Sequence, residues 1–474
     1  MSEVIRTDLC VIGGGSAGLT VAAGAAQMGA SVVLIEKDRM GGDCLNTGCV
    51  PSKALIAAAD AAQVMRSAGR FGIRAVDPEI DFAAVNRHVH DVIADIAPHD
   101  SVERFEGLGV QVILGEARFE KPDLVIAKDR AIKARRFVIA TGSRPAIPPI
   151  PGLDTVGYLT NESVFDLAER PAGLCVIGGG PVGCELAQAF RRLGSAVILI
   201  EQASILPKDD PDLSDAVRRH LIREGIDIRE NTRAASVAIQ GDRIAVQIEQ
   251  AGAADTVTAS HLLVATGRTA HIDGLGLDKA KVRTTGAGIT VDRRLRTSNK
   301  RIYAIGDVIG GLQFTHMAGY HGGIAVRNAV FRLPAKASTR AAPWVTYTDP
   351  ELAHVGLTEH DAREQGLTVK TLRSSFATND RARAERASDG SIKVILDRKT
   401  RVLGASIVGR HAGELILPWV LAINERLPIR AMASLIAPYP TLSEISKAAA
   451  GAYYTPTLYS ERTRRLVRWL QRLG

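Results

Sequence analysis

One local pattern, a strand followed by a glycine turn, a helix and a second strand, occurs twice in this sequence and strongly constrains its fold. Each turn carries the motif G-x-G-x-x-G, formed by Gly13, Gly15 and Gly18 in the first copy and by Gly178, Gly180 and Gly183 in the second. In both copies an acidic residue, Glu36 or Glu201, follows the first glycine by 23 residues and ends the second strand. Such glycines let a pyrophosphate approach the backbone at a helix N-terminus, and the acidic side chain binds ribose hydroxyls. The repeat therefore predicts an α/β protein with two Rossmann-like dinucleotide-binding units.

Both units are followed by an apolar run that ends in Ala-Thr-Gly, with Thr141 and Gly142 after the first copy and Gly267 after the second. Two dinucleotide sites in one chain indicate electron transfer between two dinucleotides. At the second site, Glu201 would repel a 2′-phosphate and accept a hydrogen bond from a free 2′-hydroxyl, and the next two residues include no arginine. We therefore expect NAD(H) to be preferred over NADP(H) there.

Two cysteines, Cys44 and Cys49, follow the first unit directly and form C-x4-C, bracketed by glycines and closed by Pro-Ser-Lys. Two thiols held beside a bound redox cofactor can cycle between dithiol and disulfide. The other three cysteines, Cys10, Cys175 and Cys184, lie in predicted strands or at a helix start, where we expect small buried apolar residues.

The composition is that of an ordinary globular protein with about three domains of roughly 150 residues. Hydrophobic residues make up 46% of the 474 positions, and no apolar run reaches the roughly 18 residues of a membrane span. No basic and apolar leader precedes the first strand, so we expect a cytoplasmic location. The net charge of +8 comes without a recognition module for nucleic acid, so we expect no such partner. We predict no metal site, because His88 and His90 do not share a helix face.

Taken together, these motifs resemble the class I flavin-dependent pyridine nucleotide-disulfide oxidoreductases. Residues 42–53 are similar to the redox-disulfide signature of that family, and residues 302–307 to its second FAD motif. The resemblance implies FAD and NAD(H) as cofactors. The residues it assigns to FAD are Gly13, Gly15, Gly18, Glu36, Lys53, Ala117, Thr141, Gly142, Gly306, Asp307 and Thr315, and those assigned to NAD are Gly178, Gly180, Gly183, Glu201 and Gly267.

The resemblance also implies an architecture. An FAD domain (residues 1–148 and 272–342) is split by an inserted NAD domain (residues 149–271). An α+β domain at residues 343–474 forms a homodimer with shared active sites. Residues 391–396 and 402–408 read as neighbouring strands of this last domain.

The same resemblance implies an electron path from NADH through flavin to a Cys44–Cys49 disulfide, and on to a small-molecule or metal-ion acceptor. Cys49 is then the sulfur that faces the flavin, and Cys44 is the interchange thiol. Lys53 is expected near the flavin, paired with Glu185. A helix that begins at the second cysteine would lower the pKa of a thiol there.

One departure concerns the acceptor. Disulfide-reducing members carry a His-x4-Glu pair, whereas this sequence has Tyr439 at the histidine position and Glu444 at the glutamate position. Tyrosine titrates near about 10 and is a poor general base at neutral pH. Mercuric reductase also has tyrosine there, but the C-terminal cysteine pair of that enzyme has no counterpart after Cys184. Three hypotheses stay open: a reductase of a disulfide, metal ion or electrophile, a dihydrolipoamide dehydrogenase, and a flavoprotein scaffold with residual diaphorase activity.

Residues 460–474 predict a basic amphipathic helix. Its apolar face comprises Leu466, Trp469, Leu470 and Leu473, and its arginines are Arg462, Arg464, Arg465, Arg468 and Arg472. Such a helix could dock on the dimer, or it could contact an anionic membrane or an acidic partner.

Overall fold

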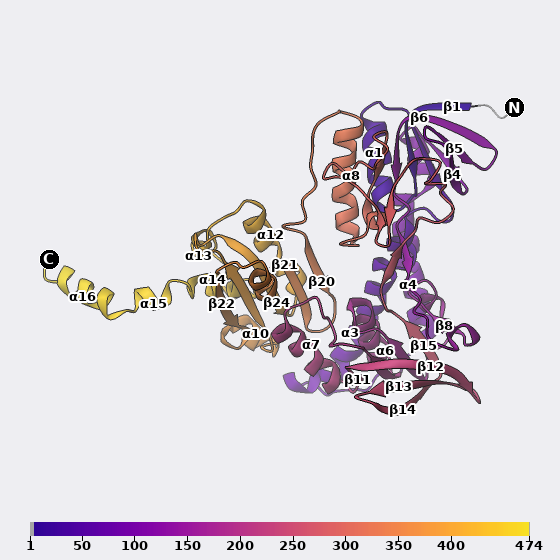
Figure 1. Ribbon diagram of the computed structural model, residues 1–474. Coiled ribbons are helices and arrows are strands. Elements are labelled where there is room, and N and C mark those ends of the chain that lie inside the picture. The colour runs from indigo at the N-terminus through magenta and orange to yellow at the C-terminus, as the bar shows by residue number, and fades with distance from the viewer. Residues whose placement is uncertain (1–3, 474) are drawn as a thin grey trace.

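The computed structural model describes residues 4–473 and contains two sheets built around parallel strands, a C-terminal antiparallel sheet and smaller antiparallel sheets (Figure 1). Residues 1–3 of the predicted FAD domain and Gly474 of the predicted tail lie outside the described residues. The parallel sheets lie on one side of the molecule, and the C-terminal antiparallel sheet lies beside them. This arrangement confirms the predicted α/β fold class.

The first sheet has seven strands in the order β3-β2-β1-β6-β5-β4, with β19 paired to β6. Pairing is parallel among β3, β2, β1, β6 and β19, and antiparallel among β4, β5 and β6. The strands are β1 (Val4–Ile12), β2 (Val32–Glu36), β3 (Val110–Leu114), β4 (Ala117–Lys121), β5 (Leu124–Ala127), β6 (Arg130–Ile139) and β19 (Ile302–Ala304). Because β19 follows the whole second sheet in sequence, the first sheet is split by an insertion, as predicted.

The second sheet is parallel throughout, in the order β11-β10-β9-β15-β8. Its strands are β8 (Tyr158–Leu159), β9 (Gly173–Ile177), β10 (Ala196–Ile200), β11 (Asp227–Arg229) and β15 (His261–Val264). An antiparallel sheet covers it, formed by β12 (Thr232–Gln240), β13 (Arg243–Gln250) and β14 (Ala253–Ala259). Where the chain passes between the two parallel sheets, β7 (Ser143–Pro145) pairs with β16 (Arg268–Ala270); the short pair β17 (Thr284–Thr285) and β18 (Gly288–Ile289) follows.

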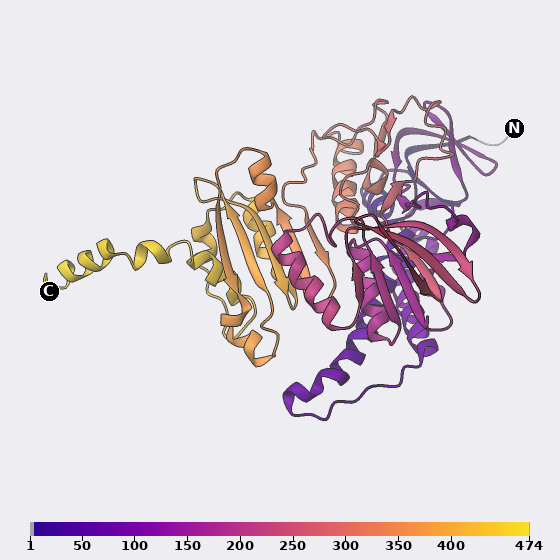
Figure 2. The same cartoon turned by 60° about the horizontal axis from the view of Figure 1, so that its bottom comes forward.

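The third sheet is antiparallel, in the order β20-β21-β24-β23-β22 (Figure 2). Its strands are β20 (Pro343–Thr346), β21 (Glu351–Gly356), β22 (Lys370–Ser375), β23 (Ser391–Leu396) and β24 (Val402–Gly409). The helices around it are α9 (Glu359–Glu364), α10 (Asp380–Ala384), α11 (Ala412–Leu415), α12 (Leu417–Asn424), α13 (Ile429–Ala433) and α14 (Glu444–Gly451). The predicted neighbouring strands are β23 and β24, so this prediction is confirmed.

The helices that precede residue 330 pack on the first two sheets or on one another. They are α1 (Ser16–Gln27), α2 (Gly42–Asn46), α3 (Cys49–Ser67), α4 (Phe82–Ile96), α5 (Val102–Gly107), α6 (Pro181–Arg192), α7 (Pro211–Arg223) and α8 (Thr315–Ala329). α1 packs on α8, whereas α3 packs on α4 and on α6, the helix of the second sheet. Leu55 and Ala59 of α3 share a buried cluster with Leu186 and Phe190 of α6. This packing fixes the cysteine segment relative to the second glycine turn.

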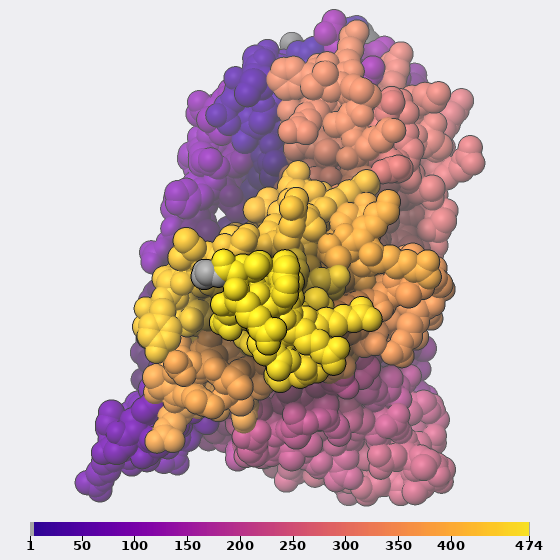
Figure 3. Space-filling model, turned by 90° about the vertical axis from the view of Figure 1, so that its left-hand side faces the viewer, coloured from indigo at the N-terminus to yellow at the C-terminus, as the bar shows by residue number. Residues whose placement is uncertain are grey.

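The last described helices, α15 (Thr455–Leu458) and α16 (Glu461–Leu470), extend away from the body (Figure 1). Figure 3, viewed from their side, shows their atoms standing in front of the C-terminal sheet region. Between residues 4 and 473, no helix has the length and apolarity needed to cross a membrane.

Candidate active site

The first glycine turn admits only glycine at two positions. Gly13 has φ = +108°, and a Cβ there would lie 2.3 Å from the carbonyl oxygen of Ala140. A Cβ on Gly18 would lie 1.8 Å from the carbonyl oxygen of Gly13, so the helix could not pack so closely on the strand. The backbone of this turn is therefore held tightly at the N-terminus of α1, where an anionic phosphate is stabilised.

The second turn repeats this geometry almost atom for atom. A Cβ on Gly178, at φ = +111°, would lie 2.4 Å from the carbonyl oxygen of Ala265. A Cβ on Gly183 would lie 1.9 Å from the carbonyl oxygen of Gly178, whereas a Cβ on Gly180 would meet nothing within 4 Å. The open side at Gly180 leaves room for a ligand to approach the backbone.

The two acidic residues are held in equivalent positions. Glu36 Oε2 accepts a hydrogen bond from the backbone N–H of Gly14 at 2.5 Å. Glu201 Oε2 accepts one from the N–H of Gly179 at 2.6 Å. Both carboxylates thus lie against the glycine turn of their own unit, as a ribose-binding group requires.

Four residues lie near the first turn, at the carboxyl ends of the parallel strands. They come from two separate segments, 141–142 and 306–307. Thr141 donates a hydrogen bond to the carbonyl oxygen of His271 at 2.7 Å, and Gly142 accepts one from the same residue at 2.9 Å. Gly306 has φ = +71°, and Asp307 accepts a hydrogen bond from the hydroxyl of Ser143 at 2.6 Å. Burial raises the pKa of Asp307. Ligands of open α/β sheets bind at this end of the strands, so the residues present fit FAD.

Ala117 and Gly267 complete the residues that sequence assigned to the cofactors. Ala117 begins β4 and is buried. Gly267, with φ = +121°, directly precedes β16, at the carboxyl end of β15. The second set lies at the carboxyl ends of β9, β10 and β15, an arrangement that fits a second dinucleotide.

The two cysteines lie on consecutive helices, Cys44 on α2 and Cys49 as the first residue of α3. The prediction that a helix begins at the second cysteine is therefore confirmed. Both are free thiols, Cys49 exposed and Cys44 half-buried, and they share a hydrogen bond. The Sγ of Cys49 also lies 3.5 Å from Oγ1 of Thr315, the first residue of α8.

The surroundings of the two thiols push their pKa values apart. The hydrogen bond from Cys44 lowers the pKa of Cys49 to about 6, and contributions from Thr315 and the charge of Lys53 act in the same direction. The same hydrogen bond, together with burial, raises the pKa of Cys44. These surroundings favour the thiolate at Cys49 and the protonated thiol at Cys44.

The remaining cysteines behave as predicted. Cys10, Cys175 and Cys184 are buried, and burial raises the pKa of each thiol, that of Cys175 to about 12. They are small apolar core residues.

Lys53 and Glu185 meet where α3 packs on α6. Lys53 Nζ lies 2.7 Å from Glu185 Oε2, and the glutamate side chain is only 6% exposed. Sequence reasoning missed a third member, Tyr347. Its ring centroid lies 4.4 Å from Lys53 Nζ, and its backbone N–H donates to Glu185 Oε1 at 2.9 Å. The loop after β20 therefore orients the ion pair.

A second missed contact fixes the cysteine segment from the other side. Asp43, next to Cys44, forms an ion pair with Arg268 at 2.7 Å. Its Oδ1 accepts hydrogen bonds from the Thr47 hydroxyl at 2.5 Å and from the Asn161 side chain at 3.1 Å. Arg268 directly follows Gly267, which the sequence analysis assigned to NAD. This adjacency was the one sequence feature that could have placed Arg268 at the site.

Tyr439 and Glu444 lie in the C-terminal part. Tyr439 is 71% exposed, and its hydroxyl donates to Asp380 Oδ2 at 3.1 Å, which raises the pKa of the phenol. Glu444 is the first residue of α14 and accepts a hydrogen bond from the N–H of Thr441 at 3.3 Å. Among residues 4–473, no hydrogen bond joins either side chain to Cys44 or Cys49.

Histidines do not gather around a metal position. His88 and His90 both lie on α4, and His316 and His321 on α8, where Phe314 stacks on His316. Across the described residues, no group of three or more histidine, cysteine or acidic side chains is placed to hold a metal ion.

Comparison with known proteins agrees with this geometry. Residues 7–322 match the family model described as pyridine nucleotide-disulphide oxidoreductase, and residues 342–450 match the dimerisation domain of that family. The chain is 37% identical to mercuric reductase of Bacillus cereus over 93% of its own length and 70% of the relative's. It is 36% identical to dihydrolipoyl dehydrogenase of Thermus scotoductus, over 95% and 98% of the two chains.

Solved structures give the same result. The Cu(II) complex of the HOCl-induced flavoprotein disulfide reductase RclA from Escherichia coli superposes with a TM-score of 0.84 at 28% identity, covering 94% of this chain and 99% of that one. LpdA from Mycobacterium tuberculosis superposes with a TM-score of 0.86 at 29% identity, with the same coverage. The chain therefore belongs to the pyridine nucleotide-disulphide oxidoreductase family, whose members bind FAD, use pyridine nucleotides and form homodimers through the C-terminal domain.

Proposed function

We propose that this protein uses NADH to reduce the Cys44–Cys49 pair through FAD, and that the reduced pair passes its electrons to a metal ion or a disulfide. One observation carries the proposal. Cys44 and Cys49 are free thiols on consecutive helices, with Cys49 at the N-terminus of α3 and 3.5 Å from Thr315 Oγ1, and the neighbouring Cys44, Thr315 and Lys53 lower the pKa of Cys49 to about 6. A thiol that ionises near neutral pH is typical of redox catalysis and not of a buried structural cysteine.

The residues at the two glycine turns support the cofactor assignment. The turn at Gly13, Glu36 and Asp307 would hold FAD, which when bound transfers an electron pair between a reduced nicotinamide and the cysteine disulfide. The turn at Gly178 and the carboxylate of Glu201 would hold NADH. Because that carboxylate repels a 2′-phosphate, we infer a preference for NADH over NADPH.

The cysteines divide the thiol chemistry between them. Two electrons and two protons convert the disulfide to two thiols, and the second proton is lost from Cys49 above its pKa of about 6. In the return direction, the sulfur of Cys44 attacks an acceptor disulfide and releases one acceptor thiol. Cys49 then attacks Cys44 in the mixed disulfide, which releases the second acceptor thiol and restores the Cys44–Cys49 bond.

The return direction requires that Cys44 lose a proton. Its pKa is raised, so a nearby group must accept this proton. Among the described residues, Cys49 is the only negatively charged side chain that shares a hydrogen bond with the Cys44 thiol. We propose that Tyr439 and Glu444 of a second copy face this thiol in the dimer. A phenol that donates to Asp380 is protonated at neutral pH and cannot accept the proton.

A metal-ion acceptor avoids this difficulty. Two adjacent thiols are soft ligands suited to a soft divalent metal ion, whose binding displaces both protons. Transfer of the electron pair from the two sulfurs to the metal then re-forms the Cys44–Cys49 bond. Two features support this acceptor: the tyrosine at position 439 and the relatives named mercuric reductase, at 35–37% identity. We therefore favour a soft metal ion over a disulfide.

A dihydrolipoyl dehydrogenase is the second candidate. Glu444 is kept at the position that the resemblance assigns to it, and relatives of that name are 33–36% identical. Tyr439 is the residue that argues against it.

Steady-state oxidation of NADH by the FAD-loaded protein tests the proposal. The acceptors are Hg(II), Cu(II), lipoamide and glutathione disulfide, with ferricyanide as an acceptor that takes electrons from flavin without thiols. Cys44→Ser should abolish turnover of the true acceptor and leave the ferricyanide rate within about twofold. If every acceptor is turned over equally by wild type and Cys44→Ser, the thiol mechanism is wrong.

A further inference from the structure

The last two helices have no partner in the described chain. No residue of α16 is buried, and four large apolar side chains of this helix and the turn after it are half or more exposed: Leu466 52%, Trp469 56%, Leu470 50% and Leu473 66%. The helix is nonetheless well formed, because the hydroxyl of Ser460 caps it by accepting the N–H of Thr463 at 3.3 Å.

The two faces of α16 differ sharply in chemistry. At 3.6 residues per turn, Leu466, Trp469, Leu470 and Leu473 project from one side, Arg464 and Arg468 project from the opposite side, and Arg465 and Arg472 lie at the border between the two. Arg462, in the first turn, falls within the arc of the apolar face. Among the described residues, Glu461 is the only one whose carboxylate pairs with these arginines, 3.5 Å from Arg464 and 3.7 Å from Arg468. The arginine side therefore has an excess of positive charge.

A shallow hollow between α15 and α16 combines both chemistries. It has a volume of about 470 Å³ and is lined by Leu458, Thr463 and Val467 together with Arg464, Arg468 and the carboxylate of Glu461. Guanidinium groups bind phosphate through paired hydrogen bonds, so a phosphate here would compete with Glu461 for Arg464 and Arg468.

We propose that α16 binds the surface of an anionic phospholipid bilayer and lies in the plane of the interface, with its leucines and Trp469 in the acyl region and its arginines among the phosphates. A bilayer surface offers both a layer of negative charge and an apolar interior within one helix diameter. An acidic protein surface without an apolar groove would satisfy the arginines but would leave the four large apolar side chains in water.

The shape of the molecule supports the same occupant. α15 and α16 extend beyond the C-terminal sheet in both ribbon views (Figures 1 and 2), and their atoms form the foremost part of the surface in Figure 3. A flat surface can therefore approach α16 without meeting the body of the chain. The inference does not depend on which acceptor the cysteines reduce.

Sedimentation of the full-length FAD-loaded protein with vesicles tests the proposal. The vesicles are phosphatidylcholine alone, or phosphatidylcholine with about 30% phosphatidylglycerol. We expect binding only to the anionic vesicles, weaker at 0.5 M than at 0.1 M salt because surface charges are screened. A blue shift of tryptophan emission should accompany it, and should disappear in Trp469→Phe.

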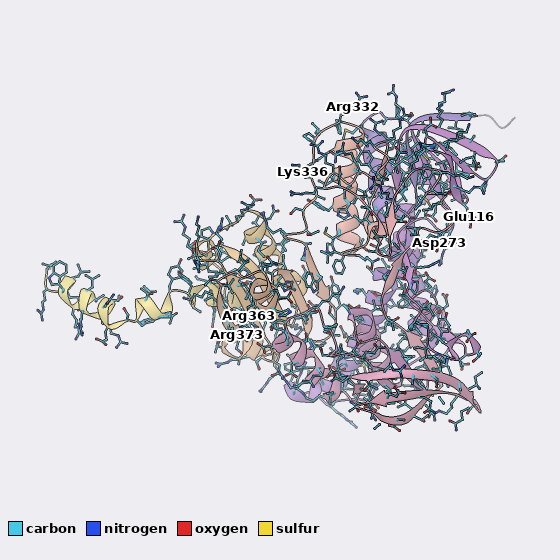
Figure 4. The ribbon with its side chains drawn as sticks, in the orientation of Figure 1. Glu116, Asp273, Arg332, Lys336, Arg363 and Arg373 are labelled. Carbon is cyan, nitrogen blue, oxygen red and sulfur yellow. The ribbon has the colours of Figure 1, made fainter. Side chains whose placement is uncertain are left out.

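Two variants separate the two faces. Leu466→Glu/Leu470→Glu should reduce binding to the level of neutral vesicles. Arg465→Gln/Arg472→Gln should weaken it about 25-fold, at about fivefold for each charge removed near an anionic surface. Arg332→Gln/Lys336→Gln removes the same charge from a loop near α8, away from α16 (Figure 4), and should change binding less than twofold. NADH–ferricyanide activity checks that each variant is folded.

Three results would overturn the proposal. Equal loss with the Arg332→Gln/Lys336→Gln control would mean that only the overall charge of the protein matters. If Leu466→Glu/Leu470→Glu dissociates the dimer, as judged by light scattering, and wild type binds no vesicles, α16 docks on the second copy. Retention on polyglutamate without any vesicle binding would assign the helix to an acidic protein.

Discussion

Lys53 Nζ lies 2.7 Å from Glu185 Oε2, although 132 residues separate the two in sequence. The first belongs to the helix that begins at Cys49, and the second to the helix that follows the other glycine turn. One ion pair therefore ties the thiol site to the predicted nucleotide site, and it lies on the contact between α3 and α6.

Substitutions of Lys53 and Glu185 should have strongly non-additive effects on the free energy of unfolding. Lys53→Met leaves the carboxylate of Glu185, 6% exposed, with only the N–H of Tyr347 as its partner. We expect the free energy of unfolding to fall by ~1–3 kcal/mol. This is less than for a fully buried pair, because the lysine side chain is 37% exposed. Glu185→Gln should also destabilise, and the double variant should be no less stable than the worse single one.

Apparent Tm of the FAD-loaded protein measures these changes. The exposed pair Arg233–Glu249, at 2.6 Å, is the control, and Arg233→Met should leave Tm nearly unchanged. Additive losses in the double variant would show that the two side chains act independently.

Sequence patterns predicted what depends on local structure. The glycine turns at Gly13 and Gly178, with an acidic residue at the end of the following strand, are specified by a few adjacent backbone positions, and the structure shows both. The helix that begins at Cys49 was predicted for the same reason, from Pro51 and the helical run that starts at Lys53.

The contacts that join these units could not be read in the same way. The pair of Asp43 with Arg268 and the position of Tyr347 over Lys53 depend on how separate sheets pack. No periodicity in the sequence encodes which helix of one sheet meets which helix of another. Lys53–Glu185 was expected only because the sequence resembles a known family.

The low pKa of Cys49 should depend mainly on the proton held by Cys44. That hydrogen bond is the largest cause of the lowered pKa, ahead of Thr315 and Lys53. Cys44→Ala removes the donor and should raise the pKa of Cys49 from about 6 toward the ordinary 9.0, whereas Cys44→Ser keeps an O–H donor and should raise it less.

The rate of iodoacetamide alkylation against pH, measured on the reduced FAD-loaded protein, reports this pKa. Wild type serves only as a reference because it has two reactive thiols, so the comparison is between the two variants. Identical midpoints for Cys44→Ala and Cys44→Ser would mean that the hydrogen bond does not set the pKa.

Asp209 should make stability depend on pH between about 4 and 6. Burial raises its pKa from the ordinary 3.8 to about 6, although Trp344 Nε1 donates to its Oδ1 at 2.8 Å. The neighbouring Asp210 also raises the pKa, and Lys208 lowers it. Below about pH 4 the carboxyl is neutral in both folded and unfolded chains, so no penalty arises. Between about pH 4 and 6 the unfolded chain loses this proton while the folded chain keeps it, so stability falls as the pH rises. Above about 6 the folded chain buries the anion and the penalty is complete.

Asp209→Asn removes this penalty and keeps an acceptor for Trp344. We expect the variant to be more stable than wild type at pH 7.5 by up to ~3 kcal/mol and equal to it near pH 4, in apparent Tm measured across this range. Asp212→Asn is the opposite control, because Arg373 and Lys393 lower the pKa of Asp212 and its charge is stabilising at neutral pH. An Asp209→Asn effect independent of pH would exclude titration as its cause.

Tyr439 should limit turnover of disulfides but not of metal ions. Its phenol donates to Asp380, and this carboxylate raises the pKa of Tyr439, so the phenol is protonated at pH 7 and cannot take the proton of Cys44. Histidine, with an unperturbed pKa of about 6.5, can do so. Tyr439→His should therefore increase NADH-dependent reduction of lipoamide or glutathione disulfide by about 10²-fold at pH 7, the lower range for a general base. Tyr439→Phe should show no gain, and neither variant should change the ferricyanide rate. If Tyr439→His and Tyr439→Phe reduce disulfides equally, proton removal at this position does not limit the reaction, and the acceptor must be selected by the shape of the dimer site.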